Sequence, residues 1–476
     1  MNQVPENAQV PETAPAPEAP KCQCQRKSNP YLYLAGFCVF LVIVGVALQG
    51  FVPPADFVAS LRKIWFSPAG LITDYVEMAG PAAAFVNAAL VTAISLLYIW
   101  AINAPINGIA VGTTGIMAGF ALFGKNVFNM LPILLGGMLY SKISKKDPAV
   151  TCCTSLMASC LGPIVSFVAF GTSLGTGILS IVLAYIAGLL VGIIVPYFAE
   201  HTLVFQHGMN LYNTGFTCGF LALFFTAFAA ALNQQSTIVS IWGNSYSMQL
   251  GIICAAVSVI FVACGLFVCG KRPNEAFAEY SSLLNKKADD FFIKEGVAPT
   301  LINMGINGLI VCAILTIIKG DFNGPTLAGI FSVWGFSAKG KHMFNTIPLY
   351  IGVLLAALAF PNIAANAASV QLAVLFITAC APLVSEFGFA AGLAAGIFHC
   401  FLVQKTGGIT GGFNLYNNGF CAGLVCCLLY PLCMEIRRIK DEYKAKKAAE
   451  AEIAAEAEAL EEEVSPEAEN PVDTAE

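Results

Sequence analysis

Long uninterrupted apolar runs constrain the fold of this chain more than any other feature. Clear examples extend from Tyr33 to Phe51, from Met248 to Cys269 and from Leu301 to Ile318. An α-helix needs roughly 20 apolar residues to cross a hydrocarbon core of about 30 Å, which is close to the length of these runs. Only 11% of the residues are charged, whereas soluble proteins carry roughly 25%. We therefore expect an all-α membrane protein that crosses the cell membrane many times.

The apolar runs predict fourteen spans in total. Eight are expected in the first part, at residues 33–51, 82–102, 106–123, 127–141, 149–171, 174–197, 209–232 and 246–269. Six follow, at residues 299–318, 324–338, 343–361, 367–387, 388–403 and 410–432. Lysines and arginines gather in four segments, at residues 21–27, 142–146, 271–294 and 437–447. Cytoplasmic loops carry an excess of these residues, so the four segments and both chain termini are predicted to be cytoplasmic.

The remaining segments complete the predicted organisation. Residues 1–30 form a proline-rich tail with a composition typical of disorder, and residues 437–476 form a charged C-terminal tail that can be partly helical. Between them lie a first membrane half at 31–270, a cytoplasmic connector at 271–297 and a second membrane half at 298–436. The chain has no basic folded module, so the expected partners are membrane lipid and a small-molecule solute rather than nucleic acid. The sequence leaves open whether the chain forms a homo-oligomer.

An internal repeat relates the two halves. The fourteen residues "GFALFGKNVFNMLP" from Gly119 and "GFSAKGKHMFNTIP" from Gly335 share seven identities at an offset of 216. Asn87 and Asn303 keep the same offset, and "GMNLYNTGFTCG" at Gly208 is answered by "GFNLYNNGFCAG" at Gly412. Fixed self-similarity of this kind indicates duplication. The first copy is assigned to residues 80–232 and the second to the half that begins at residue 298.

The predicted number of crossings gives the orientation of the two copies. Seven crossings separate the span at 82–102 from its equivalent at 299–318, and an odd number inverts one copy relative to the other. The span at 246–269 then acts as the inverting connector, and the span at 33–51 lies outside the repeat. Inverted repeats are typical of secondary transporters, because two similar halves facing opposite ways can alternate access to a central site.

The repeated Gly-Lys motif predicts the substrate site. In each half a short apolar segment is interrupted by glycine and lysine before a segment with an internal proline, which is the pattern of broken or re-entrant helices around a substrate. A lysine at membrane depth is costly and marks function. The residues expected to bind an anionic solute are Lys125, Asn126, Asn129, Lys341, His342 and Asn345. Alternatively, these segments cross fully and both lysines extend to the headgroups.

The Asn-x-Tyr-Asn blocks supply a second set of candidates. Asn210, Tyr212, Asn213 and their counterparts Asn414, Tyr416 and Asn417 offer neutral donors and acceptors for a solute. Structural hydrogen bonds between closely packed, glycine-rich helices require the same residue types. The sequence favours neither interpretation over the other.

These blocks also carry two resemblances. Tyr-Asn followed by glycine in both halves resembles the Tyr-Asn-Gly element of the urea-channel family, whose members are inverted-repeat membrane proteins. The likeness covers about a dozen residues per half, and the chain lacks that family's Leu-Pro and Thr-Pro-Phe pattern. It implies a solute-binding role for Tyr212, Asn213, Tyr416 and Asn417 only. As a whole, the chain resembles an uncharacterised bacterial family of multipass membrane proteins with duplicated Gly-Lys and Tyr-Asn motifs, which implies no substrate.

One acid lies inside an apolar run and is the candidate for ion coupling. Glu386, with Ser385 beside it, is expected to bind a proton or sodium ion, unless the end of that span lies elsewhere. No metal ligand spacing, phosphate loop or nucleophile elbow occurs, so neither a cofactor nor an enzyme is expected. The predicted function is a secondary transporter for a small polar, anionic metabolite. The alternative is a passive channel for a small neutral solute such as urea or a similar amide.

Overall fold

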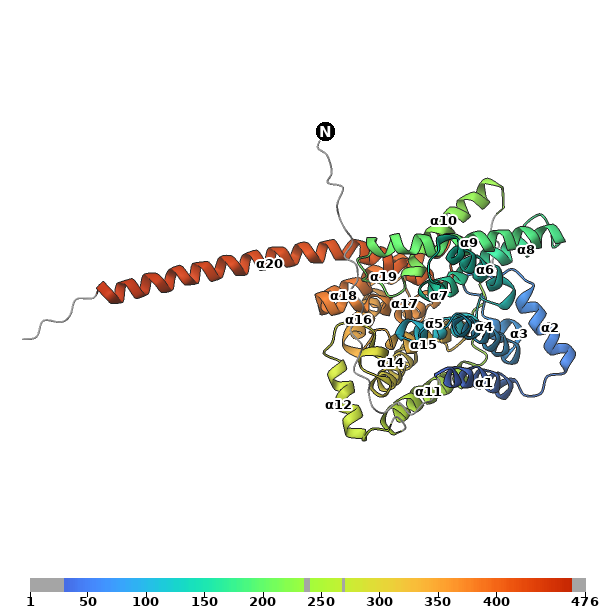
Figure 1. Ribbon diagram of the computed structural model, residues 1–476, viewed down its shortest axis with the longest axis horizontal. Coiled ribbons are helices and arrows are strands. Elements are labelled where there is room, and N and C mark those ends of the chain that lie inside the picture. Colours follow the sequence, from blue (N-terminus) through green and yellow to red (C-terminus); the bar gives the residue numbers. More distant parts are fainter. Residues whose placement is uncertain (1–29, 235–239, 268–269, 465–476) are drawn as a thin grey trace, which may run out of the picture.

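The computed structural model describes residues 30–234, 240–267 and 270–464. Within those ranges the chain is helical and contains no sheet. The tail predicted at residues 1–30 lies outside the described residues except for Pro30, and the end of the predicted C-terminal tail lies outside them too. The described part of that tail is helical, because α20 continues unbroken to Val464 and projects from the body (Figure 1).

Helices in the first half follow each other with short connections. They are α1 (Pro30–Gln49), α2 (Pro54–Trp65), α3 (Tyr75–Ala79), α4 (Pro81–Ala101), α5 (Gly108–Phe120), α6 (Val127–Ser144), α7 (Pro148–Met157), the 3-10 turn η1 (Ala158–Leu161), α8 (Gly162–Phe170), α9 (Ile178–Phe205) and α10 (Asn213–Ala231).

The second half contains the same order of elements. They are α11 (Ser247–Phe267), α12 (Pro273–Leu283), α13 (Phe291–Lys294), α14 (Val297–Ile317), α15 (Gly324–Ser337), α16 (Met343–Ala359), α17 (Ala368–Phe376), the 3-10 turn η2 (Ile377–Cys380), α18 (Ala381–Phe387), α19 (Phe389–Ile409) and α20 (Asn417–Val464).

Enough of these helices are long and apolar for a multi-pass membrane protein. By length and composition, ten described helical segments can cross a membrane, or eleven if α1 and α2, bent by 116°, form one broken span. Large apolar side chains are exposed along α9 and α11, as expected for helices that face lipid. Each of the fourteen predicted spans overlaps a helix, but α5, α15 and α16 have only 13, 14 and 17 residues.

The packing of α1 in the first half resembles that of α11 in the second. Gly45 of α1 lies against Pro81 and Ala82 at the start of α4, and Gly265 of α11 lies against Ala298 at the start of α14. Helix α11 therefore packs on α14 as α1 packs on α4, although both lie outside the predicted repeat. Sequence identity does not reveal this, because lipid-facing helices need apolar character rather than particular residues.

Helices α5 and α15 lie side by side at the centre of the molecule (Figure 1). They run antiparallel, with Gly112 against Gly335, Gly115 against Phe331 and Gly119 against Ala328. A Cβ added to Gly119 would lie 2.6 Å from the Cα of Ala328, so only glycine permits this approach. Every residue of α15 is buried. At 1.5 Å per residue each helix is only about 20 Å long, so the pair forms a short central core enclosed by protein.

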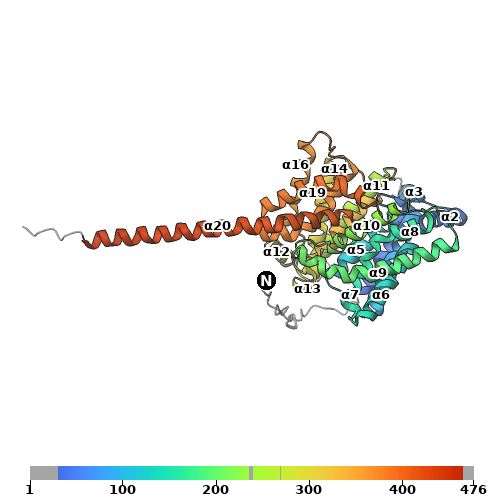
Figure 2. The same ribbon diagram turned by 90° about the horizontal axis from the view of Figure 1, so that it is seen from above.

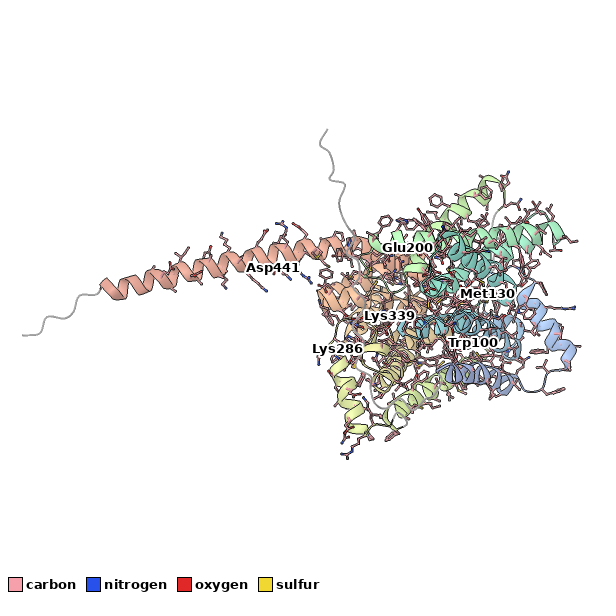
Figure 3. The ribbon with its side chains drawn as sticks, viewed as in Figure 1. Trp100, Met130, Glu200, Lys286, Lys339 and Asp441 are labelled. Carbon is pink, nitrogen blue, oxygen red and sulfur yellow. The ribbon has the colours of Figure 1, made fainter. Side chains whose placement is uncertain are left out.

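Charged residues mark one side of the body. Lys286 in the connector lies on the side from which α20 leaves, and Asp441 on the projecting part of α20 is clear of the body (Figure 3). Seen from above, α12 also lies toward this side, whereas α2 and α3 lie on the opposite side (Figure 2). The basic segments predicted at 271–294 and 437–447 therefore share one side of the molecule.

Candidate functional site

Lys125 lies in the break between α5 and α6 and is completely buried. Its ammonium donates to the Tyr416 hydroxyl at 2.8 Å and contacts the Met117 sulfur at 3.1 Å. The ammonium also lies 5.0 Å from the centre of the Tyr416 ring, within range of a cation–π interaction. Since this lysine has no exposed surface, the headgroup alternative is wrong for it.

Lys341 lies in the equivalent break between α15 and α16 and is also completely buried. Its ammonium donates to the Tyr212 hydroxyl at 2.5 Å and to the Thr378 hydroxyl at 2.8 Å. It lies 4.5 Å from the centre of the Tyr212 ring. Each lysine is thus bound by a tyrosine from the other half of the chain, and the headgroup alternative fails here too.

Neither lysine has an acidic partner. The ion pairs among the described residues include neither Lys125 nor Lys341. An isolated cation in a low-dielectric interior is costly unless it is paired. An ammonium has three donors, and the structure assigns two acceptors to each. The two sites therefore place a protonatable amine, with two acceptors assigned to it, in the protein interior.

Asparagines hold the main chain at both breaks. Asn87 of α4 donates to the carbonyl oxygens of Ala121 and Lys125, and Asn303 of α14 donates to those of Ser337 and Lys341. The interrupted backbone leaves carbonyl groups that must be paired inside a membrane protein. These amides satisfy them and fix the direction of each lysine. The sequence repeat included Asn87 and Asn303, but nothing in it assigned them this role.

The amide candidates next to the first lysine have structural roles. Asn126 caps α6 by accepting from the main chain of Asn129, and Asn129 returns a bond to the main chain of Asn126. The Asn129 amide also donates to Gly124 and to Ser166 on α8. These bonds form a capping box and anchor the break to α8. The predicted solute-binding role of Asn126 and Asn129 is therefore not favoured by their contacts.

The second break is built in the same way. The main-chain N–H of His342 donates to Asn345, whose amide donates to Gly340 and to Ser385 on α18. The His342 ring contacts the carbonyl of Lys286 in the connector at 3.1 Å. Ser385, predicted to bind a coupling ion, is instead a partner of Asn345.

The Asn-x-Tyr-Asn blocks divide into two kinds of residue. Asn210 donates to the carbonyl of Gly419, and Asn414 donates to that of Gly215. Each block is therefore hydrogen-bonded to the first turn of the corresponding helix in the other half. Their tyrosines face the lysines. The remaining amides bond within their own half: Asn213 pairs with Gln206, Thr202 and Ala199, and Asn417 pairs with Thr406.

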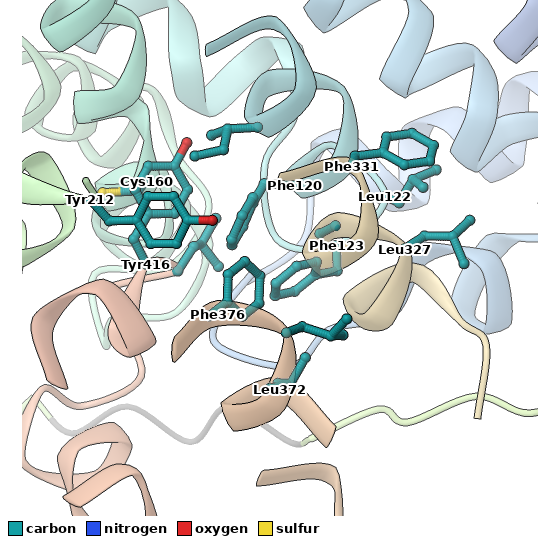
Figure 4. Packing of buried hydrophobic residues seen from close by; sticks show 14 of the residues in the cluster. Phe120, Leu122, Phe123, Cys160, Tyr212, Leu327, Phe331, Leu372, Phe376 and Tyr416 are labelled. Carbon is teal, nitrogen blue, oxygen red and sulfur yellow. The ribbon is translucent and has the colours of Figure 1, made fainter. Parts of the chain in front are cut away.

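Tyr212 and Tyr416 lie close together and line the same cavity (Figure 4). Phe120 packs edge-to-face on Tyr416 with ring centres 4.5 Å apart, and Phe336 packs on Tyr212 at 4.9 Å. Phe376 contacts both Phe120 and Tyr212. A small cavity lies between the two tyrosines, with room for roughly one water molecule. Thr214 and Asn418 also line it.

Glu386 corrects the predicted coupling site. It lies at the end of α18, where Lys287 of the connector binds one carboxylate oxygen at 2.6 Å and Arg437 of α20 binds the other at 2.8 Å. Its side chain is 26% exposed. The span ends one residue later, so the carboxylate is not isolated among apolar groups. This ion-pair network joins the connector, α18 and α20 on one side of the molecule.

A second crossed contact was not predicted from the sequence. Asp74 caps α3 and lies against Gly324 at the start of α15, whereas Asp290 caps α13 and accepts from the N–H of Gly108 at the start of α5. Asp74 and Asp290 differ by the repeat offset of 216. Carboxylates are favourable at helix N-termini because of the helix dipole. The N-termini of the central helices are thus covered by acids from the opposite half.

Comparison with known families gives one match. The model of the family described as "Protein of unknown function (DUF1576)" matches residues 54–231 and 272–435. The two matched regions fall in the two halves and are consistent with a duplicated architecture. No curated protein and no solved structure matches the chain. Since the family model covers more than half of the sequence, the chain belongs to the DUF1576 family.

Proposed function

We propose that this chain is a secondary transporter for a small, anionic metabolite, with its site between two inverted repeats. The observation that carries the proposal is the pair of buried lysines, each hydrogen-bonded by a tyrosine of the opposite half and neither paired with an acid. Buried ionisable groups in membrane proteins mark substrate and ion pathways. An anion bound between the halves would supply a negative counter-charge, which the described residues give to neither lysine.

The inverted arrangement is supported by contacts that stay the same when the halves are exchanged. Gly215 of α10 lies against Tyr416, and Gly419 of α20 lies against Tyr212. Leu211 donates to Ala379, and Leu415 donates to Cys160. Equivalent residues therefore contact one another reciprocally, as across a two-fold axis.

The number of segments favours inversion of the second half. With α11 taken as the start of that half, the fourteen predicted spans divide into seven and seven, and an odd number reverses the second half in the membrane. The basic clusters beside α20 and in the connector favour a cytoplasmic location for the side that they share. The antiparallel packing of α5 against α15 also favours inversion.

The closed centre fits one stage of alternating access. The cavity between Tyr212 and Tyr416 is too small for a metabolite, the rings of Phe120 and Phe376 line it, and Phe336 packs on Tyr212. A solute can enter only if the halves move apart on one side. The crossed lysine–tyrosine bonds lie between the halves and would change during that movement.

Uptake by proteoliposomes tests the proposal. A thermal-shift screen of the purified chain against small carboxylates, phosphate and neutral amides first selects solutes, because a bound ligand raises the apparent stability. Labelled solute is then added with and without an inward proton or sodium gradient. Saturable uptake that follows a gradient is expected. Non-saturating, gradient-independent flux of an anion would overturn the transporter assignment.

A passive channel for a small neutral solute is the second candidate. The observation that favours it is that the residues lining the central cavity include Thr214 and Asn418, which carry neutral donors and acceptors. A selective channel would conduct urea or a similar amide without saturation and without response to ion gradients. The same assay, run with labelled urea, distinguishes the two functions.

A further inference from the structure

The two crossed aspartates occupy similar positions but have different surroundings. Asp290 accepts from the N–H of Gly108 with both oxygens, each at 3.0 Å, and Lys339 lies 3.7 Å from one of them. Its side chain is 15% exposed. Residue 123, which corresponds to Lys339 in the first half, is a phenylalanine. Asp74 therefore lacks the cation that its counterpart has.

Asp74 is buried and one of its oxygens is unpaired. The residue is 1% exposed, and Oδ1 accepts from the N–H of Val76 at 2.9 Å. Oδ2 has no hydrogen-bond partner of good geometry in the described structure. Burial raises the pKa of Asp74 to about 6, against the lowering effect of main-chain N–H groups at Val76, Glu77, Gly324 and Gly243. An unpaired buried carboxylate oxygen is costly unless it takes a proton or another ligand.

The unpaired oxygen points toward an exposed acid. A Cβ added to Gly243 would lie 2.6 Å from Asp74 Oδ2 and 2.7 Å from Glu77 Oε2, so the two carboxylates flank the same glycine. Glu77 is exposed, and its other oxygen accepts from Ser245. Glu77 thus gives the buried Asp74 a short connection to solvent.

The other titratable groups around Asp74 already form hydrogen bonds with other residues. On α2, Lys63 donates to the carbonyl of Met78 at 2.7 Å. Before α15, Asp321 accepts from Trp242 at 2.8 Å. On α3, Tyr75 accepts from Asn126. None of these contacts supplies a cation to Asp74.

We propose that Asp74 is the proton-binding group that couples transport to a proton gradient, with Glu77 as the exposed acid that exchanges the proton with solvent. The inference rests on the proposed transport function. A proton passes from water to Glu77 and then to Asp74 Oδ2, and no other bond is broken. As a carboxylate, Asp74 is attracted to the positive N-terminus of α15, and as a neutral acid it is not.

The position of Asp74 lets this change affect the contact between halves. Asp74 belongs to the first half, whereas Gly324 begins the central helix of the second. Protonation therefore loosens the contact between halves on the side of α2 and α3, away from α20 (Figure 2). The ion pair of Lys339 with Asp290 gives the opposite side a fixed contact.

Proton binding is measured first, without any solute. The full-length protein in lipid nanodiscs is titrated from pH 7 to pH 5 in unbuffered solution, and bound protons are counted by potentiometry. Wild type is expected to bind about one proton more than Asp74→Asn, as expected for a group that titrates near pH 6. The exposed Asp56→Asn on α2 should match wild type. Equal proton binding by wild type and Asp74→Asn would overturn the proposal.

A second variant keeps the test valid if Asp74→Asn does not fold. Glu77→Gln preserves Asp74 but removes the exposed acid, so the same number of protons should bind after a pH jump, at a lower rate. Unchanged kinetics would overturn the role of Glu77. Replacing choline by sodium at constant pH should not release the proton, and release by sodium would overturn the assignment to protons.

Transport with a gradient completes the test. Proteoliposomes receive a labelled panel of small dicarboxylates and phosphate under an inward pH gradient of one unit, which can drive up to about tenfold accumulation when one proton is coupled. Asp74→Asn should not accumulate solute under the gradient. Gradient-driven accumulation that persists in this variant would overturn the coupling role of Asp74. If none of the panel is transported while Asp74 still binds its proton, the proton site stands and the proposed transport function fails.

Discussion

The pockets of Lys125 and Lys341 share their main features but differ in one contact. Both lysines are buried, both bind a tyrosine of the opposite half, and an asparagine fixes the main chain of both. The second acceptor is the Met117 sulfur for Lys125 and the Thr378 hydroxyl for Lys341. A thioether is a weak acceptor, so Lys125 depends more on its tyrosine.

The two halves differ more at the two sides of the molecule than they do at the lysine pockets. Asp74 is buried without a cation, whereas Asp290 pairs with Lys339, and Glu386 lies in a basic network where the first half has Phe167. The crossed contacts at the centre are therefore alike in the two halves. The outer contacts diverged, which gives the two sides different chemistry.

Loss of either lysine is expected to have the largest effect. Lys125→Met or Lys341→Met should each reduce uptake about 100-fold, because a bond to a charged group contributes about 1.5–3 kcal/mol. If the two sites are equivalent, the losses should match. The stability should be unchanged or higher, since replacing a buried charge by an apolar group of similar size is often stabilising. Thermal unfolding and uptake, with the exposed Lys142→Met as control, measure both.

A lysine variant that transports normally would contradict the central site. Unequal losses of uptake would instead assign solute binding mainly to one lysine. The two halves would then have different roles. The comparison is therefore informative only when both variants are measured in parallel at equal protein content.

The stability of the protein should depend on pH through Asp74. Its folded pKa of about 6 lies above the usual value, so between about pH 4 and pH 6 the folded state binds more protons than the unfolded state. Stability is therefore expected to fall as pH rises through this window, by up to about 3 kcal/mol, and to stay level above it. Chemical unfolding at several pH values measures this dependence.

The Asp74 dependence has a matched control. Asp74→Asn should remove most of the slope between about pH 4 and pH 6, and Asp56→Asn should retain it. A slope that survives in Asp74→Asn would assign it to another group and would weaken the contrast between the two sides.

Removing the tyrosine hydroxyls should show the difference between the lysine pockets. Tyr416→Phe leaves Lys125 with the Met117 sulfur alone, whereas Tyr212→Phe leaves Lys341 with Thr378. Each change should lower the free energy of unfolding by about 1–3 kcal/mol, with Tyr416→Phe the more costly. The exposed Tyr197→Phe serves as control. Equal costs would mean that Met117 satisfies the ammonium as well as Thr378 does.

Glu386 should have the smallest effect. Its ion pairs are partly exposed, and such pairs contribute about 0–1 kcal/mol. Glu386→Gln should therefore change stability little and leave the dependence of uptake on a gradient intact. Uptake that no longer follows the gradient in this variant, with Asp74→Asn unaffected, would return the coupling role to Glu386.

Local patterns predicted most of the fold. Each apolar run overlaps a helix, and the Gly-Lys motifs mark the breaks at Lys125 and Lys341. The similar packing of α1 and α11 was missed because lipid-facing helices keep hydrophobicity without keeping residues. The short helices α3 and α13, which position Asp74 and Asp290, were missed because neither forms an apolar run.

The candidate site was predicted in part. The sequence identified Lys125, Lys341, Tyr212 and Tyr416, but it grouped each lysine with the amides beside it. Those amides cap helices, because a broken helix in a membrane must satisfy its own main chain first. Glu386 was misplaced for a related reason: an apolar sequence does not show where a span ends against a basic neighbour.

The sequence by itself determined that the chain is apolar and helical, with an internal sequence similarity that places two lysines at matching Gly-Lys motifs. These properties depend on composition, hydrophobic length and self-similarity, which are local or additive along the chain. Only the tertiary structure decided that each lysine meets the tyrosine of the other half, and that Asp74 and Asp290 cover each other's central helices. Such contacts depend on how two halves cross in space, and close approach through glycines at α5 and α15 permits that crossing.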